Sequence, residues 1–357
     1  MVRKAASGRR ASMEVMAAAF GESGGSFSRP YLNNTFKQEL FSIGPVWRKF
    51  AAIGIVLVFP SAQPRGIACA MTEAPTPFAI GLDGGGSGCR VAICDASGAI
   101  LGRGEGGPAN ATTDFDGTVR HLCAALDIAC VGAGVTVADL AEVPAHAGLA
   151  GVISAEVGDR VAAALPLRRV TVTEDSDTML AGALGPQDGA LAAIGTGSFF
   201  ARQAGGVSRS VGGWGFQLSD QASGAWLGHE LMKLALHVSD GLVAESPLAR
   251  AVLDEIGGPP GLVAFGRRAF AHDYAAYAPR IVEAAKAGDS AGLSLMWQGA
   301  TFLRFALDGL GHRAGEPLCL TGGVGVHYAP YLDDLTLIAP KGSALDGALA
   351  LARRIPA

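Results

Sequence analysis

The sequence predicts an α/β protein made of two similar halves with a cleft between them. Strand-like and helix-like patterns alternate from Phe78 to the end of the chain, which is typical of α/β domains. A glycine-rich strand–turn–strand unit occurs near residues 81–88 and again near residues 195–198. A Gly- and Pro-containing break at residues 185–189 separates the two units and is expected to form a hinge. Because ligands favour such clefts, the repeat also predicts a binding site between the halves.

The first half is expected to begin with three hairpin-connected strands, at residues 78–82, 91–94 and 99–104. Apolar residues at helical spacing then predict a helix over residues 114–132. Two further strand–helix pairs follow. The strands are expected at residues 145–150 and 170–173, and the helices at 154–165 and 175–184.

The second half is expected to start with a strand–turn–strand unit over residues 190–202, followed by a helix over residues 224–238. Further helices are expected within residues 261–312, after a Gly-Gly-Pro-Pro loop at 257–260. A buried strand at 318–320 leads into Thr-Gly-Gly-Val-Gly, and a last strand at 335–339 precedes a helix over 344–353.

Composition separates the first 70 residues from the remainder. The chain has 357 residues, of which 49% are hydrophobic and 17% charged, so a well-buried globular protein is expected. The net charge of −4 gives no reason to expect nucleic acid as a partner. Residues 1–70 carry a net charge of +6 and the remainder −10, which marks the leader as a different kind of sequence.

The leader contains an apolar run at residues 51–59 that is too short to cross a bilayer. Met71 is expected to be the biological start, and residues 1–75 to be a disordered or non-native leader. The protein is expected to be cytoplasmic, without a membrane partner. Its six cysteines form no CxxC pair and no zinc-finger spacing, so we expect them to be small buried side chains in a reducing compartment.

The turn after the first strand, Asp83-Gly84-Gly85-Gly86-Ser87-Gly88, indicates phosphate chemistry. Glycines bring backbone N–H groups close to a ligand, and a row of such groups binds anions. An acid beside that site would repel phosphate unless Mg²⁺ lies between them, so Asp83 is the candidate metal-side residue. The alternative is an ordinary glycine-rich hairpin turn.

Two further segments strengthen the phosphate interpretation. The turn Gly195-Thr196-Gly197-Ser198 is small and rich in N–H and hydroxyl groups, and it occupies the matching position of the second half. The segment at residues 320–325 follows a buried strand, and its glycines would let a base or ribose lie against the backbone. Its spacing is not that of a Rossmann fingerprint, and the chain has no P-loop sequence.

Taken in order, these motifs resemble those of the sugar kinase/actin/Hsp70 superfamily, and more closely those of the BadF/BadG/BcrA/BcrD ATPase family, which includes N-acetylglucosamine kinases. Residues 78–90 resemble the first phosphate motif, 193–198 the second, 320–325 the adenosine motif and 340–348 the closing segment. The resemblance implies two actin-like (ribonuclease H-like) ATPase domains with an interdomain cleft. They would span residues 76–185 and 186–343, with the closing helix at 344–355 packed on the first.

The resemblance also implies roles for individual residues. Asp175 would be the catalytic acid that takes the proton of the sugar hydroxyl; capping the helix at 176–184 is its alternative role. ATP and Mg²⁺ would be the cofactors, with Asp83 on the metal side. Nucleotide contacts are expected from Gly84, Gly85, Gly86, Ser87, Gly195, Thr196, Gly197, Gly322 and Gly323. Sugar contacts are expected from Asn110, Gly213, Trp214, Gly215 and Asp220.

The implied activity is ATP-dependent phosphorylation of the 6-hydroxyl of N-acetylglucosamine or glucosamine. The chain has Ser-Asp-Gln-Ala-Ser at residues 219–223, where the amino-sugar kinases usually have Gly-Asp-Glu-Gly-Ser, and this leaves the choice of sugar open. Trp214 could face a sugar ring or pack in the core. Two other functions remain: an ATPase activator of a 2-hydroxyacyl-CoA dehydratase, which would need an iron–sulfur cluster, and a non-catalytic sugar sensor. A homodimer is compatible with all three, and the sequence does not fix the oligomeric state.

Overall fold

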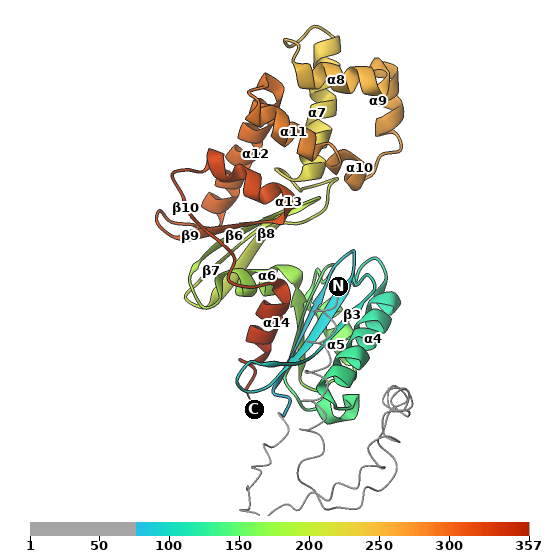
Figure 1. The fold of residues 1–357 in the computed structure, drawn as a ribbon, viewed down its shortest axis with the longest axis vertical. Helices are drawn as coiled ribbons and strands as arrows, with labels where there is room; N and C mark the ends of the chain where they lie inside the picture. The colour runs from blue at the N-terminus through green and yellow to red at the C-terminus, as the bar shows by residue number, and fades with distance from the viewer. Residues whose placement is uncertain (1–75, 357) are drawn as a thin grey trace, which may run out of the picture. The chain divides into compact units, whose positions relative to one another are not determined.

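The computed structural model describes residues 76–356. The leader predicted at residues 1–75 lies outside the described residues. The described chain forms two five-stranded mixed sheets with helices packed on them (Figure 1), which confirms the predicted α/β class.

The first sheet has the strand order β3-β2-β1-β4-β5. Strands β1, β2 and β3 pair antiparallel, whereas β4 runs parallel to β1 and β5 runs parallel to β4. The strands span Ala79–Gly84, Cys89–Cys94, Ile100–Gly106, Ala145–Leu149 and Val170–Glu174. The helices of this part are α4 (Phe115–Ala133), η1 (Val137–Leu140), α5 (Ala155–Ala164) and α6 (Asp175–Leu184).

The second sheet repeats this topology. Its order is β10-β9-β6-β7-β8, with β6, β7 and β8 antiparallel and with β9 and β10 added in parallel. The strands span Gly189–Ile194, Ser198–Ala204, Val207–Gly212, Pro317–Thr321 and Thr336–Ile338. Each sheet is therefore a three-stranded meander followed by two parallel strands, which is the duplicated unit that the two glycine turns predicted.

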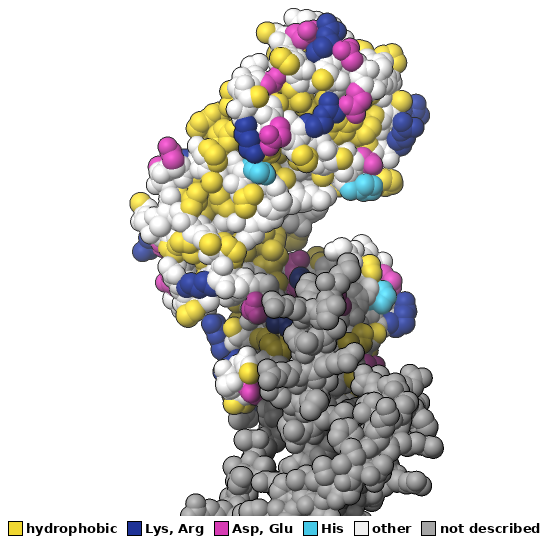
Figure 2. Space-filling model, in the orientation of Figure 1, with side chains coloured by type: hydrophobic (Ala, Val, Ile, Leu, Met, Phe, Trp, Pro, Cys, Tyr) yellow, Lys and Arg dark blue, Asp and Glu magenta, His cyan; other side chains and the backbone are white. Residues whose placement is uncertain are grey.

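Most of the helices lie between β8 and β9. They are α7 (Gly224–Ser239), α8 (Pro247–Ile256), α9 (Gly258–Gly266), α10 (Ala271–Ala275), α11 (Ala278–Lys286) and α12 (Ser290–Gly309). Two short helices, α13 (Gly322–Gly325) and η2 (Val326–Tyr331), follow β9, and α14 (Ala344–Ala352) is the last helix. In Figure 2, Lys and Arg side chains are interspersed with Asp and Glu on the visible surface outside the grey residues.

The alternation of side chains along the strands explains the layers. One face of the first sheet packs on α4 through Ile80, Leu82 and Val91, and the other face packs on α14 through Ala79 and Ala92. The second sheet packs on α7 and its neighbours through one face and on α6 through the other. Helix α6 also contacts α14, and glycines permit this close crossing, since a Cβ on Gly182 would lie 1.9 Å from the Ser343 carbonyl oxygen.

The structure differs from the predicted elements at residues 257–260 and in strand β8. Residues 257–260 are not a loop: Gly257 ends α8 with a left-handed φ of 87°, and α9 begins at Gly258. The prolines lie in the first turn of α9, where their missing N–H groups have no helical partner to lose. In the segment at residues 320–325, Gly322 to Gly325 form the short helix α13 directly after β9. Strand β8 was not predicted, since its Val-Ser-Arg-Ser-Val-Gly sequence is mostly exposed and lacks an apolar face.

The break at residues 185–189 is the connection between α6 and β6. Side chains from two other segments hold it in place. Lys341, just before α14, donates from Nζ to the Leu184 carbonyl at 2.8 Å, and Gln203, on β7, donates from Nε2 to the Gly185 carbonyl at 2.7 Å. No helix in the part of the chain that the structure describes is long and apolar enough to cross a bilayer.

Candidate active site

The candidate active site is built on the carboxyl edge of the first sheet. Strands β1, β4 and β5 are parallel, and their register aligns their carboxyl ends. The first glycine turn follows β1, Asn110 bridges to the residue after β4, and Asp175 follows β5. Ligands of α/β sheets bind outside this edge. The structure therefore brings the predicted residues Asp83, Asn110 and Asp175 to one place.

Asp83 is a buried carboxylate paired with Arg90. The guanidinium Nη2 of Arg90 lies 2.6 Å from Asp83 Oδ2, because the β1–β2 register places the two residues opposite each other. Burial raises the pKa of Asp83, and the Arg90 guanidinium lowers it by less. Arg90 was not among the predicted site residues, although its position across the hairpin turn from Asp83 would have predicted the pairing.

Asp175 is the first residue of α6 and lies in a low-dielectric environment. Burial raises the pKa of this carboxyl, and the nearby carboxylates of Asp83 and Glu174 raise it further. The helix N-cap is Glu174, so the alternative in which Asp175 caps α6 is wrong. A carboxyl with a raised pKa at the carboxyl edge of a sheet is suited to accept a proton.

These carboxylates can be tested for their fit to Mg²⁺. Mg²⁺ is usually held by one or two carboxylates together with water and substrate phosphates. Asp83 and Asp175 are close enough to raise the pKa of Asp175, and Arg90 is the cation recorded against this pair among residues 76–356. The buried Asp83 and the half-buried Asp175 with one partner cation leave negative charge for a further cation, so the site fits the ion, with Asp83 as the main candidate ligand.

In the first glycine turn, lack of space requires a glycine only at Gly84, and backbone angles require none at Gly84, Gly85 or Gly86. Gly84, Gly85 and Gly86 are not among the glycines with positive φ. A Cβ on Gly84 would lie 2.7 Å from Leu149 Cδ2, whereas a Cβ on Gly85 or Gly86 would meet nothing within 4 Å. The tip of the turn is thus open to a ligand, and the Ser87 side chain is exposed beside it.

One side-chain atom of Asn110, Oδ1, is hydrogen-bonded within its own loop. Its Oδ1 accepts the backbone N–H groups of Thr112 and Thr113, each at 3.1 Å. The amide Nδ2 has no hydrogen bond recorded within residues 76–356. Asn110 can therefore donate to a ligand at the sheet edge while its carbonyl oxygen fixes the loop.

The second glycine turn lies on the amino end of α7. The backbone N–H of Gly224 donates to the Gly195 carbonyl at 2.8 Å, and that of Ala225 donates to the Thr196 carbonyl at 3.1 Å. Because these two N–H groups at the amino end of α7 are already hydrogen-bonded, they cannot bind a phosphate. A phosphate bound here would have to be held by the N–H and hydroxyl groups of the turn itself. Thr196 is exposed and its hydroxyl is available for that contact.

Asp220 lies directly beneath this second turn. A Cβ on Gly197 would lie 2.8 Å from Asp220 Oδ2, and the backbone of Ser198 hydrogen-bonds to the same carboxylate. Burial raises the pKa of Asp220. The residue has a φ of 66°, a strained conformation for a side chain of this kind. Asp220, predicted to contact the sugar, therefore lies against Gly197 and Ser198 of the turn predicted to contact phosphate.

The segment before Asp220 presents an indole to solvent. Gly213 and Gly215 have φ values of 75° and 86°, which residues with a Cβ rarely adopt. Between them, Trp214 is 66% exposed, so the alternative in which it packs in the core is wrong. The next residue, Phe216, packs against His229 and Tyr274 with ring centroids 5.6 and 5.2 Å away. The segment is therefore anchored by Phe216 and leaves Trp214 free.

The third predicted segment packs on the second turn. Gly322 has a φ of 85°, and a Cβ there would lie 2.3 Å from the Ile194 carbonyl oxygen. Gly323 is exposed, and a Cβ added to it would meet no atom within 4 Å. Farther along, the fully buried Tyr328 donates its hydroxyl to the Ala222 carbonyl at 2.7 Å. No pattern in the sequence indicated this link between the third segment and the Asp220 loop.

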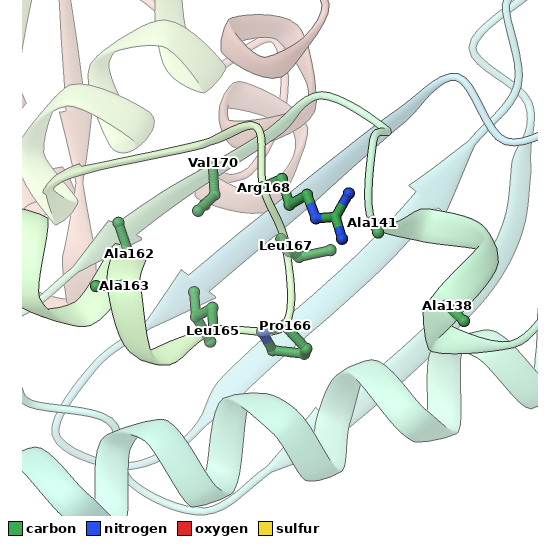
Figure 3. A pocket seen from close by; sticks show the side chains of 9 residues that line it. All are labelled: Ala138, Ala141, Ala162, Ala163, Leu165, Pro166, Leu167, Arg168 and Val170. Carbon is green, nitrogen blue, oxygen red and sulfur yellow. The ribbon is translucent and has the colours of Figure 1, made fainter.

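A pocket of about 700 Å³ lies away from these residues. Figure 3 shows it between α5 and η1, lined mainly by Ala, Leu and Pro side chains, with Arg168 at one side. Val170, at the amino end of β5, belongs to it, so it lies at the edge of the sheet opposite to Asp175. It contains none of the candidate site residues.

Comparison with known proteins settles the family. The model of the BadF/BadG/BcrA/BcrD ATPase family matches residues 80–341. The chain belongs to this family. Membership implies ATP binding, and the repeated five-stranded sheets are the duplicated actin-like ATPase fold that the motifs predicted.

Two curated relatives are sugar kinases by name. Glucosamine kinase GspK of Vibrio cholerae is 29% identical over 280 residues, which cover 77% of this chain and 95% of the relative. The N-acetylmuramic acid/N-acetylglucosamine kinase of Clostridium acetobutylicum is 28% identical over 183 residues, which cover 50% of this chain and 59% of the relative.

A solved structure supports the fold. A Chromobacterium violaceum protein, provisionally named as an N-acetylglucosamine kinase, is 31% identical, has a TM-score of 0.66 and matches 78% of this chain and 99% of its own.

Proposed function

We propose that the protein is an ATP-dependent kinase that phosphorylates the 6-hydroxyl of glucosamine or N-acetylglucosamine. The observation that carries the proposal is Asp175, a carboxyl with a raised pKa at the sheet edge that also holds Asp83 and the first glycine turn. The names of the relatives support an amino sugar as the acceptor.

In this mechanism the units built on the two sheets, residues 76–185 with the closing helix and residues 186–343, are two domains with the nucleotide between them. The turns at Gly84–Ser87 and Gly195–Gly197 hold the phosphates, and Gly322 and Gly323 lie against the nucleoside. Asn110, Asp220 and the Gly213–Gly215 segment hold the sugar. Bound Mg²⁺ would neutralise charge on the phosphates, with Asp83 as its protein ligand.

The reaction requires one proton acceptor. The oxygen of the sugar 6-hydroxyl forms a bond to the γ-phosphorus, the bond between that phosphorus and the β–γ bridging oxygen breaks, and ADP leaves. The hydroxyl proton passes to Asp175. Exclusion of water by domain closure would limit hydrolysis of ATP.

The cysteines do not favour the dehydratase-activator alternative. Cys89, Cys94, Cys130 and Cys319 are buried, and burial raises the pKa of their thiols. A cluster shared between two copies needs accessible thiolates. A brown purified protein with bound iron and sulfide would favour that alternative, and a colourless protein would exclude it.

The direct test is an assay of ADP release across hexoses and amino sugars. We expect ADP release that depends on glucosamine or N-acetylglucosamine, and loss of that release in Asp175→Asn with nucleotide binding retained. ADP release that is independent of sugar, or absent with every sugar, would contradict the proposal and favour the ATPase or the sensor.

A further inference from the structure

A second pocket contains none of the residues assigned above. Its volume is about 440 Å³, within the range of small-molecule sites. The lining comes from β4, β5, α6, the α6–β6 connection, the β7–β8 hairpin and the end of α14 with the residues after it. Its polar side chains are His146, Thr173, Asp177, Asp188, Gln203, Ser208 and Arg354. We call it the acceptor pocket.

The buried end of the acceptor pocket presents a hydrogen-bond acceptor. His146 is 6% exposed, and burial lowers the pKa of its imidazole to about 4, so the ring is neutral near pH 7. The single hydroxyl proton of Thr173 goes to the Glu174 carbonyl at 3.1 Å. The Nε2 atom of His146 lies 3.1 Å from the same hydroxyl oxygen, and a proton on Nε2 completes a hydrogen bond there. In that tautomer Nδ1 carries no proton and can accept one hydrogen bond.

The donor groups of Gln203 and Ser208 are also already hydrogen-bonded within the protein. Nε2 of Gln203 donates to the carbonyls of Gly185 and Gln187, which leaves Oε1 as an acceptor. The Ser208 hydroxyl donates to Asp177 Oδ1 at 2.9 Å, which leaves Oδ2 of Asp177 available. Arg354 is the one lining side chain that still offers donors.

Charge favours the same kind of ligand. Asp177 and Asp188 bring two negative charges and Arg354 brings one positive charge. Asp188 also accepts the Gly205 N–H and lies near Arg202, so Asp177 is the less compensated of the two acids. Among residues 76–356, no salt bridge is recorded to Asp177 or Asp188, and no group of three or more His, Cys, Asp or Glu is placed to hold a metal ion. An organic cation rich in donors would satisfy the lining better than a metal ion or an anion.

We propose that the acceptor pocket is a second binding site that takes a small organic molecule carrying a primary ammonium group. Such a group offers three donors and one positive charge to Asp177, Asp188 and the neutral acceptors beside them. The ligand would contact α6 two residues after Asp175, and the β7–β8 hairpin of the second sheet at the same time.

The test measures binding, so it does not depend on the proposed kinase activity. The full chain is titrated with ethanolamine and with ethylene glycol, its uncharged counterpart, by calorimetry or saturation-transfer NMR. Ethanolamine is expected to bind and ethylene glycol to bind at least about tenfold more weakly, since a hydrogen bond to a charged group contributes about 1.5–3 kcal/mol.

Two variants assign the site. Asp177→Asn keeps an acceptor for the Ser208 hydroxyl but removes the charge, and is expected to weaken ethanolamine binding about tenfold or more. Ser208→Ala is the matched control: it removes the same hydrogen bond, keeps the charge, and is expected to change binding less than about threefold. Thermal unfolding checks that both variants fold.

The outcomes separate the proposal from its alternatives. No binding of ethanolamine, equal binding in Asp177→Asn and the unmodified chain, or equal losses in both variants would overturn it. A competition arm identifies the source of the amine. Displacement of ethanolamine by glucosamine but not by N-acetylglucosamine indicates an amino sugar, and no displacement by either indicates a non-sugar amine.

Discussion

Replacing Asp175 by asparagine is expected to abolish turnover and to stabilise the folded protein at the same time. The two effects have one cause. Burial, with Asp83 and Glu174 nearby, raises the pKa of Asp175. A carboxyl whose pKa is higher in the folded than in the unfolded chain contributes fully to the stability of the fold only below its unfolded pKa of 3.8. That contribution is lost as the pH rises through the folded pKa. At pH 7 the ionised carboxylate is a cost that asparagine removes.

Because the pKa of Asp175 is raised in the folded protein, Asp175→Asn is expected to raise Tm at pH 7 and to change it less at pH 4, where the folded carboxyl is protonated. Removal of a general base lowers kcat by about 10²- to 10⁴-fold.

The assay pairs thermal unfolding at pH 4 and pH 7 with ADP release under saturating ATP and sugar. Asp159→Asn is the matched control, because Asp159 is an exposed acid on α5 away from the site, and both readouts should stay unchanged. Turnover of Asp175→Asn within about tenfold of the unmodified protein would refute the base assignment. A lower Tm at pH 7 would refute the electrostatic argument.

Further predictions concern the turn, the buried tyrosine and the pH profile. Gly84→Ala should cost about 1–3 kcal/mol, because its Cβ would lie 2.7 Å from Leu149 Cδ2, whereas Gly86→Ala meets nothing within 4 Å and should leave stability unchanged. Urea unfolding compares the two, and equal losses would contradict the space argument. Tyr328→Phe leaves the Ala222 carbonyl without its donor and should cost about 1–3 kcal/mol, with a raised KM for the sugar; unchanged values of both would show that the link is dispensable. The raised pKa of Asp175 predicts that kcat/KM increases with pH above the ordinary carboxylate range, and a flat profile there would argue against a single carboxyl base.

The sequence predicted the elements that local patterns determine. The helix at residues 175–184 was predicted with the observed ends, because an acidic start after a strand and a glycine after the last turn mark both boundaries. The two glycine hairpins predicted the repeated topology. Strand β8 was missed because only two of its six residues are large and apolar and most of the strand is exposed, so no buried face marks it.

Features of the candidate site that depend on long-range contacts could not be predicted. The positive φ of Asp220 and its position under Gly197 depend on how the loop after β8 packs against the turn between β6 and β7. The Tyr328 hydrogen bond joins residues more than 100 positions apart. The exposure of Trp214 excludes core packing, and composition alone could not exclude it.

The most direct test of the proposed function is identification of the product. The protein is incubated with ATP, Mg²⁺ and either glucosamine or N-acetylglucosamine, and the products are followed by phosphorus NMR and mass spectrometry. The account predicts one molecule of sugar 6-phosphate for each ADP formed. ADP with inorganic phosphate and unmodified sugar, or phosphate on a different hydroxyl, would contradict it.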